Sequence, residues 1–288
     1  MPDGHDLAVI EDIILRRDRR GISALKPYLP DDFCSQAAQL IVDHPGPAVV
    51  CTGFYTLAAG APETDGPPGA CFIGQALEKL GYSVTYVSDM YSAFALRGTV
   101  PPEKVVEFPI ADDSSSQRSA QELLERVQPS VVISIERCGR TRTGRYLNMR
   151  GVDISQYNAK LDYLFSCHEI TVGIGDGGNE IGMGNLAQQI PLIATLPDDP
   201  AITGVNKLII ASISNWGGHG LVAALSLLVG ENLLPSVREE EEVIRDMVDR
   251  GVVDGISGQR AYTVDGFSLA HNGHVLESLH ALLRERGL

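Results

Sequence analysis

The sequence is short of basic residues and contains no long apolar segment. Its 288 residues include 23 Lys and Arg against 37 Asp and Glu, which gives a formal net charge of −14. Nucleic acids and anionic membranes reward a basic surface, so we expect neither of them as the main partner. The longest apolar run, residues 221–229, is about half of the roughly 20 residues that a membrane-spanning helix needs.

Cysteine is also scarce and forms no recognisable pattern. The five cysteines are odd in number and include no C-x-x-C pair, so neither a disulfide framework nor a zinc knuckle is indicated. The polar N-terminus is followed by no apolar stretch with a small-residue cleavage site, so no secretion signal is visible. We therefore expect a cytoplasmic protein, and the base rate of soluble oligomers favours a homodimer.

Short apolar runs alternate with helical patterns along most of the chain. We predict strands at residues 48–52, 83–87, 105–108, 131–135, 170–174 and 207–211, and helices at residues 70–80, 119–127, 220–229, 238–250 and 276–286. This alternation predicts an open, mostly parallel sheet with helices on both faces, a three-layer, Rossmann-like α/β fold. Residues 1–44 are predicted to be a helical segment that covers the core, and residues 45–288 to form the α/β core of a single domain, 1–288.

The loop at residues 53–69 is the first candidate for a functional site, because ligands of open α/β sheets bind beyond the carboxyl ends of the strands. It is long for a strand-to-helix connection, and its prolines and glycines make it stiff. Glu63 and Asp65 lie in this loop, close to the start of the next helix, where they either act in catalysis or cap that helix. We favour catalysis, because a cap needs only one acid. Gly53, at the end of the strand, is a candidate substrate contact.

A glycine-rich turn at residues 173–185 is the second candidate. Its Gly173, Gly175 and Gly178 match a dinucleotide-binding pattern literally. However, Asp176 and Glu180 would place two carboxylates against the pyrophosphate that such a turn attracts. Asp176, Asn179 and Glu180 are better suited to a hard cation, Mg²⁺ or Mn²⁺. The alternative is a tight turn whose glycines are structural and whose Asn179 caps a helix.

The third candidate segment follows the predicted strand at residues 131–135. Residues 137–150 contain five arginines and no acid, a strong contrast in so acidic a chain. Such a group is typical of a site for a substrate carboxylate or phosphate, and the candidate substrate-binding residues in it are Arg137, Arg140, Arg142 and Arg145. The alternatives are a salt-bridge cluster and a dimer interface. Glu136, the first residue after the strand, could join the metal ligands.

Asn215 and His219 precede the apolar helix that is predicted at residues 220–229. Asn215 is a candidate substrate-binding residue. His219 can transfer protons near neutral pH, although a packed or capping histidine is an equal alternative. Asp254 and Asp265, on either side of a glycine-containing turn, could supply a further carboxylate.

Two strings in the sequence carry a family resemblance. They are T-G-F with P-E-T-D-G-P-P-G-A, at residues 52–54 and 62–70, and G-x-G-D-G-G-N-E-I-G-M-G-N, at residues 173–185. In this order and separation they resemble the domain family found at the C-terminus of mitochondrial D-glutamate cyclase, which prokaryotes carry as a standalone protein. The resemblance runs from about residue 48 to the C-terminus. It implies an α/β fold, a metal bound by acidic residues, and interconversion of D-glutamate with 5-oxo-D-proline and water.

Three functions therefore stay open at this point. The first is a metal-assisted cyclase or hydrolase, a lyase of the D-glutamate cyclase type, that acts on a small anionic substrate. The second is a phosphatase or nucleotide hydrolase that depends on Mg²⁺ or Mn²⁺ and binds phosphate through the arginines. The third is a non-catalytic metal- or ligand-binding domain that acts beside a partner.

Overall fold

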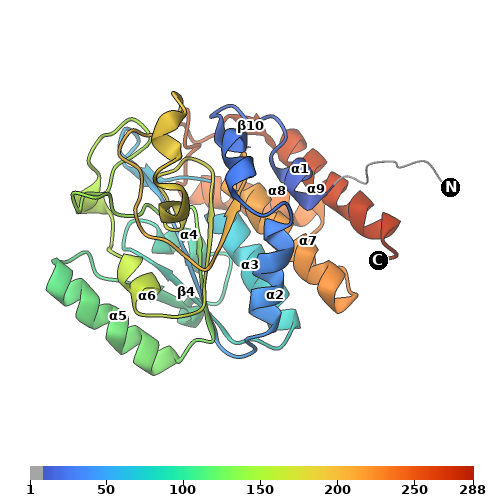
Figure 1. The fold of residues 1–288 in the computed structure, drawn as a ribbon, viewed down its shortest axis with the longest axis horizontal. Coiled ribbons are helices and arrows are strands. Elements are labelled where there is room, and N and C mark those ends of the chain that lie inside the picture. The colour runs from blue at the N-terminus through green and yellow to red at the C-terminus, as the bar shows by residue number, and fades with distance from the viewer. Residues whose placement is uncertain (1–8) are drawn as a thin grey trace.

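The computed structural model describes residues 9–288, and a six-stranded sheet forms its centre (Figure 1). All neighbouring strands of this sheet are parallel, in the order β5-β4-β1-β6-β7-β8. They are β1 (Ala48–Thr52), β4 (Val84–Ser88), β5 (Val105–Glu107), β6 (Val131–Ile135), β7 (Thr171–Gly175) and β8 (Lys207–Ile210). Two small antiparallel hairpins pair β2 (Tyr55–Thr56) with β3 (Ala61–Pro62) and β9 (Thr263–Val264) with β10 (Phe267–Ser268).

Each face of the sheet has its own hydrophobic core, because successive side chains of a strand point to opposite faces. Ala48 and Val50 pack into the larger core, whereas Val49 and Cys51 pack into the smaller one. The helices with residues in the larger core are α1 (Ile10–Ile14), α2 (Phe33–Val42), α3 (Pro67–Lys79), α4 (Ala93–Arg97), α7 (Ser214–Val229), α8 (Val237–Arg250) and α9 (Leu269–Glu285). Those with residues in the smaller core are α5 (Asp113–Val127) and α6 (Asp162–Ser166), which lie together away from α2, α3 and α7 in Figure 1.

The structure confirms the predicted fold: an open parallel sheet between two layers of helices. All six predicted strands are present, within a residue or so of their expected bounds. Residues 9–44 contain α1, the 3₁₀ helix η1 (Ile22–Tyr28) and α2. The first eight residues of the predicted helical segment 1–44 lie outside the described part of the chain. Further 3₁₀ turns are η2 (Pro102–Lys104), η3 (Ser155–Tyr157), η4 (Met183–Leu186) and η5 (Ile190–Leu192).

Several helices begin earlier than the apolar pattern indicated. The largest differences are at α9, which starts at Leu269 rather than residue 276, and at α5 and α7, which each start six residues early, at Asp113 and Ser214. Asp112 explains the early start of α5, because it caps the helix: its side chain accepts a hydrogen bond from the amide of Ser115 at 2.8 Å. No helix in residues 9–288 combines the length and the apolar character that crossing a membrane would require.

The strand order reverses between β1 and β6 at the centre of the sheet. Counted along the chain, the six strands are arranged 3-2-1-4-5-6, the order of a doubly wound sheet. The connections that leave β1 and β6 turn away from each other at this point, which opens a crevice beyond the carboxyl ends of the strands. The loops after β1, β6 and β7 all contribute acidic side chains there.

Candidate functional site

Asp65 lies in the loop after β1 and holds the beginning of α7. Its Oδ2 accepts a hydrogen bond from the amide of Ser214, and its Oδ1 accepts one from the amide of Asn215, each at 2.8 Å. In return, Asn215 Oδ1 accepts hydrogen bonds from the amides of Gly66 and Gly69 at 3.0 and 2.9 Å, at the start of α3. The free amides at each helix end are thus satisfied by the other segment, which fixes the carboxylate of Asp65 in place.

Glu136 is the first residue after β6, and its backbone makes a sharp bend there, with φ at +44°. Its Oε2 accepts a hydrogen bond from Ser214 Oγ at 2.6 Å, so the start of α7 orients a second carboxylate. A Cβ at Gly66 would lie 2.6 Å from the Cβ of Glu136, which explains why glycine occupies that position in the loop. The stiff loop and the bent strand end are therefore packed directly against each other.

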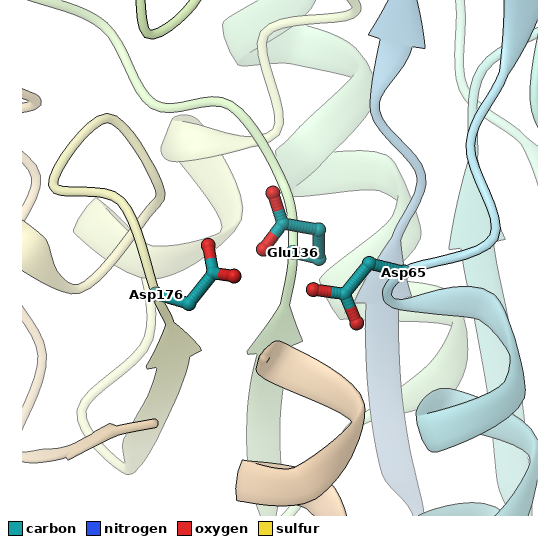
Figure 2. A group of neighbouring side chains, drawn as sticks. All are labelled: Asp65, Glu136 and Asp176. Atoms are coloured by element: carbon teal, nitrogen blue, oxygen red, sulfur yellow. The ribbon is translucent and has the colours of Figure 1, made fainter. Parts of the chain in front are cut away.

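Asp176 is the first residue after β7 and is completely buried. Its Oδ1 forms an ion pair with Arg20 Nη1, whereas its Oδ2 has no hydrogen-bond partner among the described residues. Figure 2 shows that Asp176, Glu136 and Asp65 point toward one another from three neighbouring loops. One carboxylate oxygen from each of the three lies within 4.8 Å of the other two.

The shared burial changes the titration of all three carboxyl groups. Burial, opposed in part by hydrogen bonds from Asn215 and Ser214, raises the pKa of Asp65 to about 7. Burial together with the neighbouring Asp176 holds the pKa of Glu136 well above its usual range. Burial also holds the pKa of Asp176 high, although the guanidinium of Arg20 acts against it. Both a raised pKa and a bound cation relieve the cost of buried negative charge.

A cavity of about 380 Å³ reaches this cluster at Glu136. Glu63, Glu136 and Asn179 line it, together with Arg20, the turn at residues 148–150 and the turn at residues 255–258. The amide oxygen Oδ1 of Asn179 is buried and unpartnered within the described residues, while its Nδ2 donates to the carbonyl of Leu147 at 3.0 Å. The cavity thus offers an acidic floor and an unused hydrogen-bond acceptor.

The structure brings Glu63, Asp65, Glu136, Asp176 and Asn179 to one place, as the loop positions predicted. Glu180 is close by, but its carboxylate turns back into its own loop. Its Oε1 and Oε2 accept hydrogen bonds from the amides of Gly177 and Gly178 at 2.8 and 2.7 Å. Glu180 therefore shapes the turn that carries Asp176, rather than joining the three converging carboxylates as the predicted metal ligand.

The four arginines predicted to bind substrate do not line the cavity. Arg137 is buried and pairs with Asp89 at 2.6 Å, and its Nη1 donates to the carbonyl of Gly53 at 2.8 Å. Arg140 lies over the ring of Tyr163, and Arg142 and Arg145 are exposed. Gly53 has a packing role, because a Cβ there would lie 2.5 Å from the Cβ of Ser92.

His219 and Asn215 also have structural partners instead of a place at the cavity. Because α7 begins at Ser214, His219 lies inside the helix and not in a loop before it. It is fully buried, its Nε2 lies 2.7 Å from Glu240 Oε1 on α8, and its ring packs near Phe72. His219 therefore connects α7 to α8 in this structure and does not line the cavity.

Arg20 is not among the predicted site residues and comes from the segment expected only to cover the core. Its Nη1 and Nη2 pair with Asp176 and Asp265, so one guanidinium holds two carboxylates of the site. The backbone around Arg20 is fixed, because Asp18 Oδ1 accepts hydrogen bonds from the amides of Arg20 and Gly21 at 2.9 and 2.8 Å. Four arginines between residues 16 and 20 of an acidic chain were the available signal.

The fold and the site together define an open α/β protein with a cluster of buried carboxylates at the point where the strand order reverses. The family described as D-glutamate cyclase-like, C-terminal, matches residues 10–280, so the chain belongs to that family. Human mitochondrial D-glutamate cyclase is 30% identical over 281 residues, a match that covers 82% of this chain and 45% of the human protein. The chain thus spans less than half the length of that relative.

Among solved structures, the chain resembles an exopolyphosphatase-related protein from Bacteroides fragilis. The two share 8% sequence identity and a TM-score of 0.43, over 90% of this chain and 58% of the other. A likeness at this level carries no conclusion about function.

The raised pKa values predict how the stability of the metal-free protein depends on pH. Free carboxyl groups titrate near pH 4, so between about pH 4 and the higher folded-state pKa the folded protein binds more protons than the unfolded chain. Stability should therefore fall as the pH rises through 7, where Asp65 titrates. In Glu136→Gln this fall should be shallower, because the variant lacks one of the carboxyl groups whose pKa burial raises. Relative to the wild type, the variant should be more stable at pH 8 than at pH 5.

Urea unfolding of both proteins from pH 5 to pH 9, in the presence of a chelator, measures this slope. Glu277→Gln, at an exposed acid of α9, is the matched control and should leave the slope unchanged. Equal slopes for wild type and Glu136→Gln would contradict the raised pKa of Glu136.

Arg20→Gln should destabilise the metal-free protein, because it leaves Asp176 and Asp265 without their counter-charge. Removing one partner of a buried ion pair costs about 3 kcal/mol or more. Urea unfolding at pH 7 checks this value. Arg19→Gln is the control, since the Arg19 guanidinium lies 3.7 Å from the centre of the Phe267 ring, a contact worth about 1 kcal/mol or less. Equal losses in the two variants would show that Arg20 is no more than a surface cation.

Proposed function

We propose that this protein is a metal-assisted cyclase that interconverts D-glutamate with 5-oxo-D-proline and water, a lyase of the D-glutamate cyclase type. The observation that carries the proposal is the convergence of Asp65, Glu136 and Asp176 beneath a cavity, in a chain that belongs to the D-glutamate cyclase-like family. The substrate would be a small anionic amino acid or lactam. The predicted homodimer stays a prediction.

The residues present fit a divalent ion such as Mg²⁺ or Mn²⁺. Hard cations of this kind prefer carboxylate and amide oxygens, and the three carboxylates offer oxygens within 4.8 Å of one another. The unpartnered Oδ2 of buried Asp176 is the strongest sign, because buried polar atoms normally have a partner. Asp65, Glu136 and Asp176 would hold the ion, which would supply Lewis-acid polarisation of the substrate carboxyl or lactam carbonyl.

Ring closure joins the substrate amine nitrogen to the γ-carboxyl carbon and breaks one carbon–oxygen bond of that carboxyl. Counted from the ammonium and the γ-carboxylate, two protons leave the nitrogen and one carboxyl oxygen departs. Together they form one water, and the lactam nitrogen keeps one hydrogen. The site must therefore take protons from nitrogen and deliver them to oxygen. The reverse reaction adds water to the lactam carbonyl and breaks the carbon–nitrogen bond.

Glu63 is the residue best placed to move these protons. It lines the cavity, and burial together with Asp265 and Asp65 holds its pKa well above the usual range. A carboxyl group with a raised pKa can both donate and accept a proton near neutral pH. Asn179 Oδ1, which has no partner among the described residues, can accept a hydrogen bond from the substrate N–H.

No specific observation favours the phosphatase alternative. Arg140, Arg142 and Arg145, which would hold a phosphate, do not line the cavity, and its floor is acidic. The alternative of a non-catalytic partner domain is addressed by the turnover experiment below.

Metal binding is the first test of the proposal. Calorimetric titration of the metal-stripped protein with Mn²⁺ and with Mg²⁺ should show saturable binding at one site. Asp176→Asn should weaken it at least about tenfold, because one charged ligand is lost. Glu180→Gln, whose carboxylate accepts hydrogen bonds from its own loop, should weaken it less than Asp176→Asn does. Wild-type protein that binds neither ion would overturn the proposal of a metal site.

Turnover is the second test, and Glu63→Gln separates chemistry from metal binding. With metal present, the wild type should convert D-glutamate and 5-oxo-D-proline into each other, as followed by chromatography. Glu63→Gln should keep the metal affinity and lose about 100-fold or more in kcat, the usual contribution of a general acid or base. Metal binding without turnover in the wild type would support the partner-domain alternative instead.

A further inference from the structure

Arg150 is an arginine of the 137–150 segment that does line the cavity. It is exposed, and no hydrogen bond or ion pair engages its guanidinium within residues 9–288. The two terminal nitrogens of Arg137 are engaged by Asp89 and backbone carbonyls, and Arg140 lies over Tyr163. The guanidinium of Arg150 therefore lies at the cavity and has no hydrogen bond or ion pair with other described residues.

Arg20, the other arginine at the cavity, is already engaged. Its two terminal nitrogens pair with Asp176 and Asp265. Binding a substrate anion through Arg20 would require one of these buried carboxylates to give up its counter-charge. Arg150 carries no such cost, so it is the better candidate for an incoming anion.

The backbone beneath Arg150 is held in a tight turn. Asn148 Oδ1 accepts hydrogen bonds from the amides of Arg150 and Val152 at 2.9 and 3.0 Å, and the amide of Gly151 donates to the carbonyl of Asn148 at 2.8 Å. Gly151 has a φ of +71°, which glycine adopts without strain. The turn thus presents Arg150 from a defined position rather than from a loose loop.

The same turn is attached to the turn that carries Asp176. Asn179 Nδ2 donates to the carbonyl of Leu147, and the amide of Gly139 donates to the carbonyl of Asn179 at 2.9 Å. A Cβ at Gly177 would lie 2.6 Å from Met149 Sδ, so the side chain next to Arg150 touches the residue next to Asp176. The backbone at Arg150 is therefore tied to the turn that carries Asp176.

We propose that Arg150 binds the carboxylate of the substrate that does not react. This inference rests on the proposed cyclase function, in which that group is the α-carboxylate of D-glutamate and the ring carboxylate of 5-oxo-D-proline. A guanidinium binds a carboxylate through two parallel hydrogen bonds and so fixes its orientation. Arg150 would bind one end of the substrate, and the acidic floor would face the amine and the reacting carboxyl. The cavity would therefore select small amino acids and lactams that carry a free carboxylate.

The test compares 5-oxo-D-proline with its primary amide by calorimetry on the metal-loaded protein. The wild type should bind the acid about tenfold to a hundredfold more tightly than the amide, the usual range for a hydrogen bond to a charged group. Arg150→Gln should lose this preference with little change in affinity for the amide. Arg142→Gln, an exposed arginine of the same segment that does not line the cavity, is the matched control and should keep it.

Kinetics give a second measurement on the same variants. Arg150→Gln should raise KM for 5-oxo-D-proline more than it lowers kcat, because the carboxylate is bound in the ground state and in the transition state alike. The inference is overturned if Arg150→Gln retains the preference for the acid, or if the wild type shows no such preference.

Glutarate, a dicarboxylate without the amine, makes the two proposals distinguishable. Tighter binding of glutarate to the wild type than to Arg150→Gln supports the role of Arg150, whether or not the wild type turns over 5-oxo-D-proline. If turnover is absent in that case, only the proposed reaction is wrong. If the wild type turns over 5-oxo-D-proline but binds glutarate no more tightly than Arg150→Gln does, the proposed reaction is supported and the proposed role of Arg150 is wrong.

Discussion

The burial of many carboxyl groups around one guanidinium is the constraint on which the rest of this structure depends. Six carboxyl groups interact electrostatically with Arg20, and five of them are buried: Asp65, Glu136, Asp176, Glu180 and Asp265, with Glu63 the sixth. If all six were ionised, the group would carry 1 − 6 = −5 charges. Buried charge is tolerated when it is paired, protonated or bound to a metal. Arg20 pairs two of these groups, and raised pKa values and a bound cation are the remaining means of relief.

The scaffold serves to hold these mutually repelling groups together. The start of α7 binds two of them, since the amides of Ser214 and Asn215 donate to Asp65 and the hydroxyl of Ser214 donates to Glu136. Asn215 then ties the same helix end to the start of α3. These contacts meet where the strand order reverses, so loops from distant parts of the chain reach one crevice. The stiffness of the 53–69 loop is explained by this task.

The sheet and the placement of Glu136 and Asp176 at its edge could be predicted from the sequence, because both depend on local patterns. Short apolar runs mark the strands, and a residue directly after a parallel strand lies at the ligand-binding edge, as Glu136 and Asp176 do. Long-range contacts could not be predicted. The cap of α7 comes from Asp65, which is 149 and 150 residues away along the chain, and Arg20 reaches Asp176 across 156 residues. No pattern within a short window reports such contacts. For the same reason, the different surroundings of the five arginines in residues 137–150 could not be predicted. Arg137 is buried in an ion pair, Arg140 lies over an aromatic ring, Arg142 and Arg145 are exposed, and Arg150 lines the cavity.

The number of protons released when Mn²⁺ binds shows whether the buried carboxyl groups are protonated in the metal-free protein. Calorimetric titrations at one pH in buffers of different ionisation enthalpy give this number. Because carboxylates ligate a metal in their ionised form, groups that stay protonated in the metal-free protein must lose their protons on binding. We expect a clear release of protons at pH 6 to 7, in line with the pKa of about 7 for Asp65, and a smaller release at higher pH. Binding of Mn²⁺ with no proton release across this range would contradict this expectation.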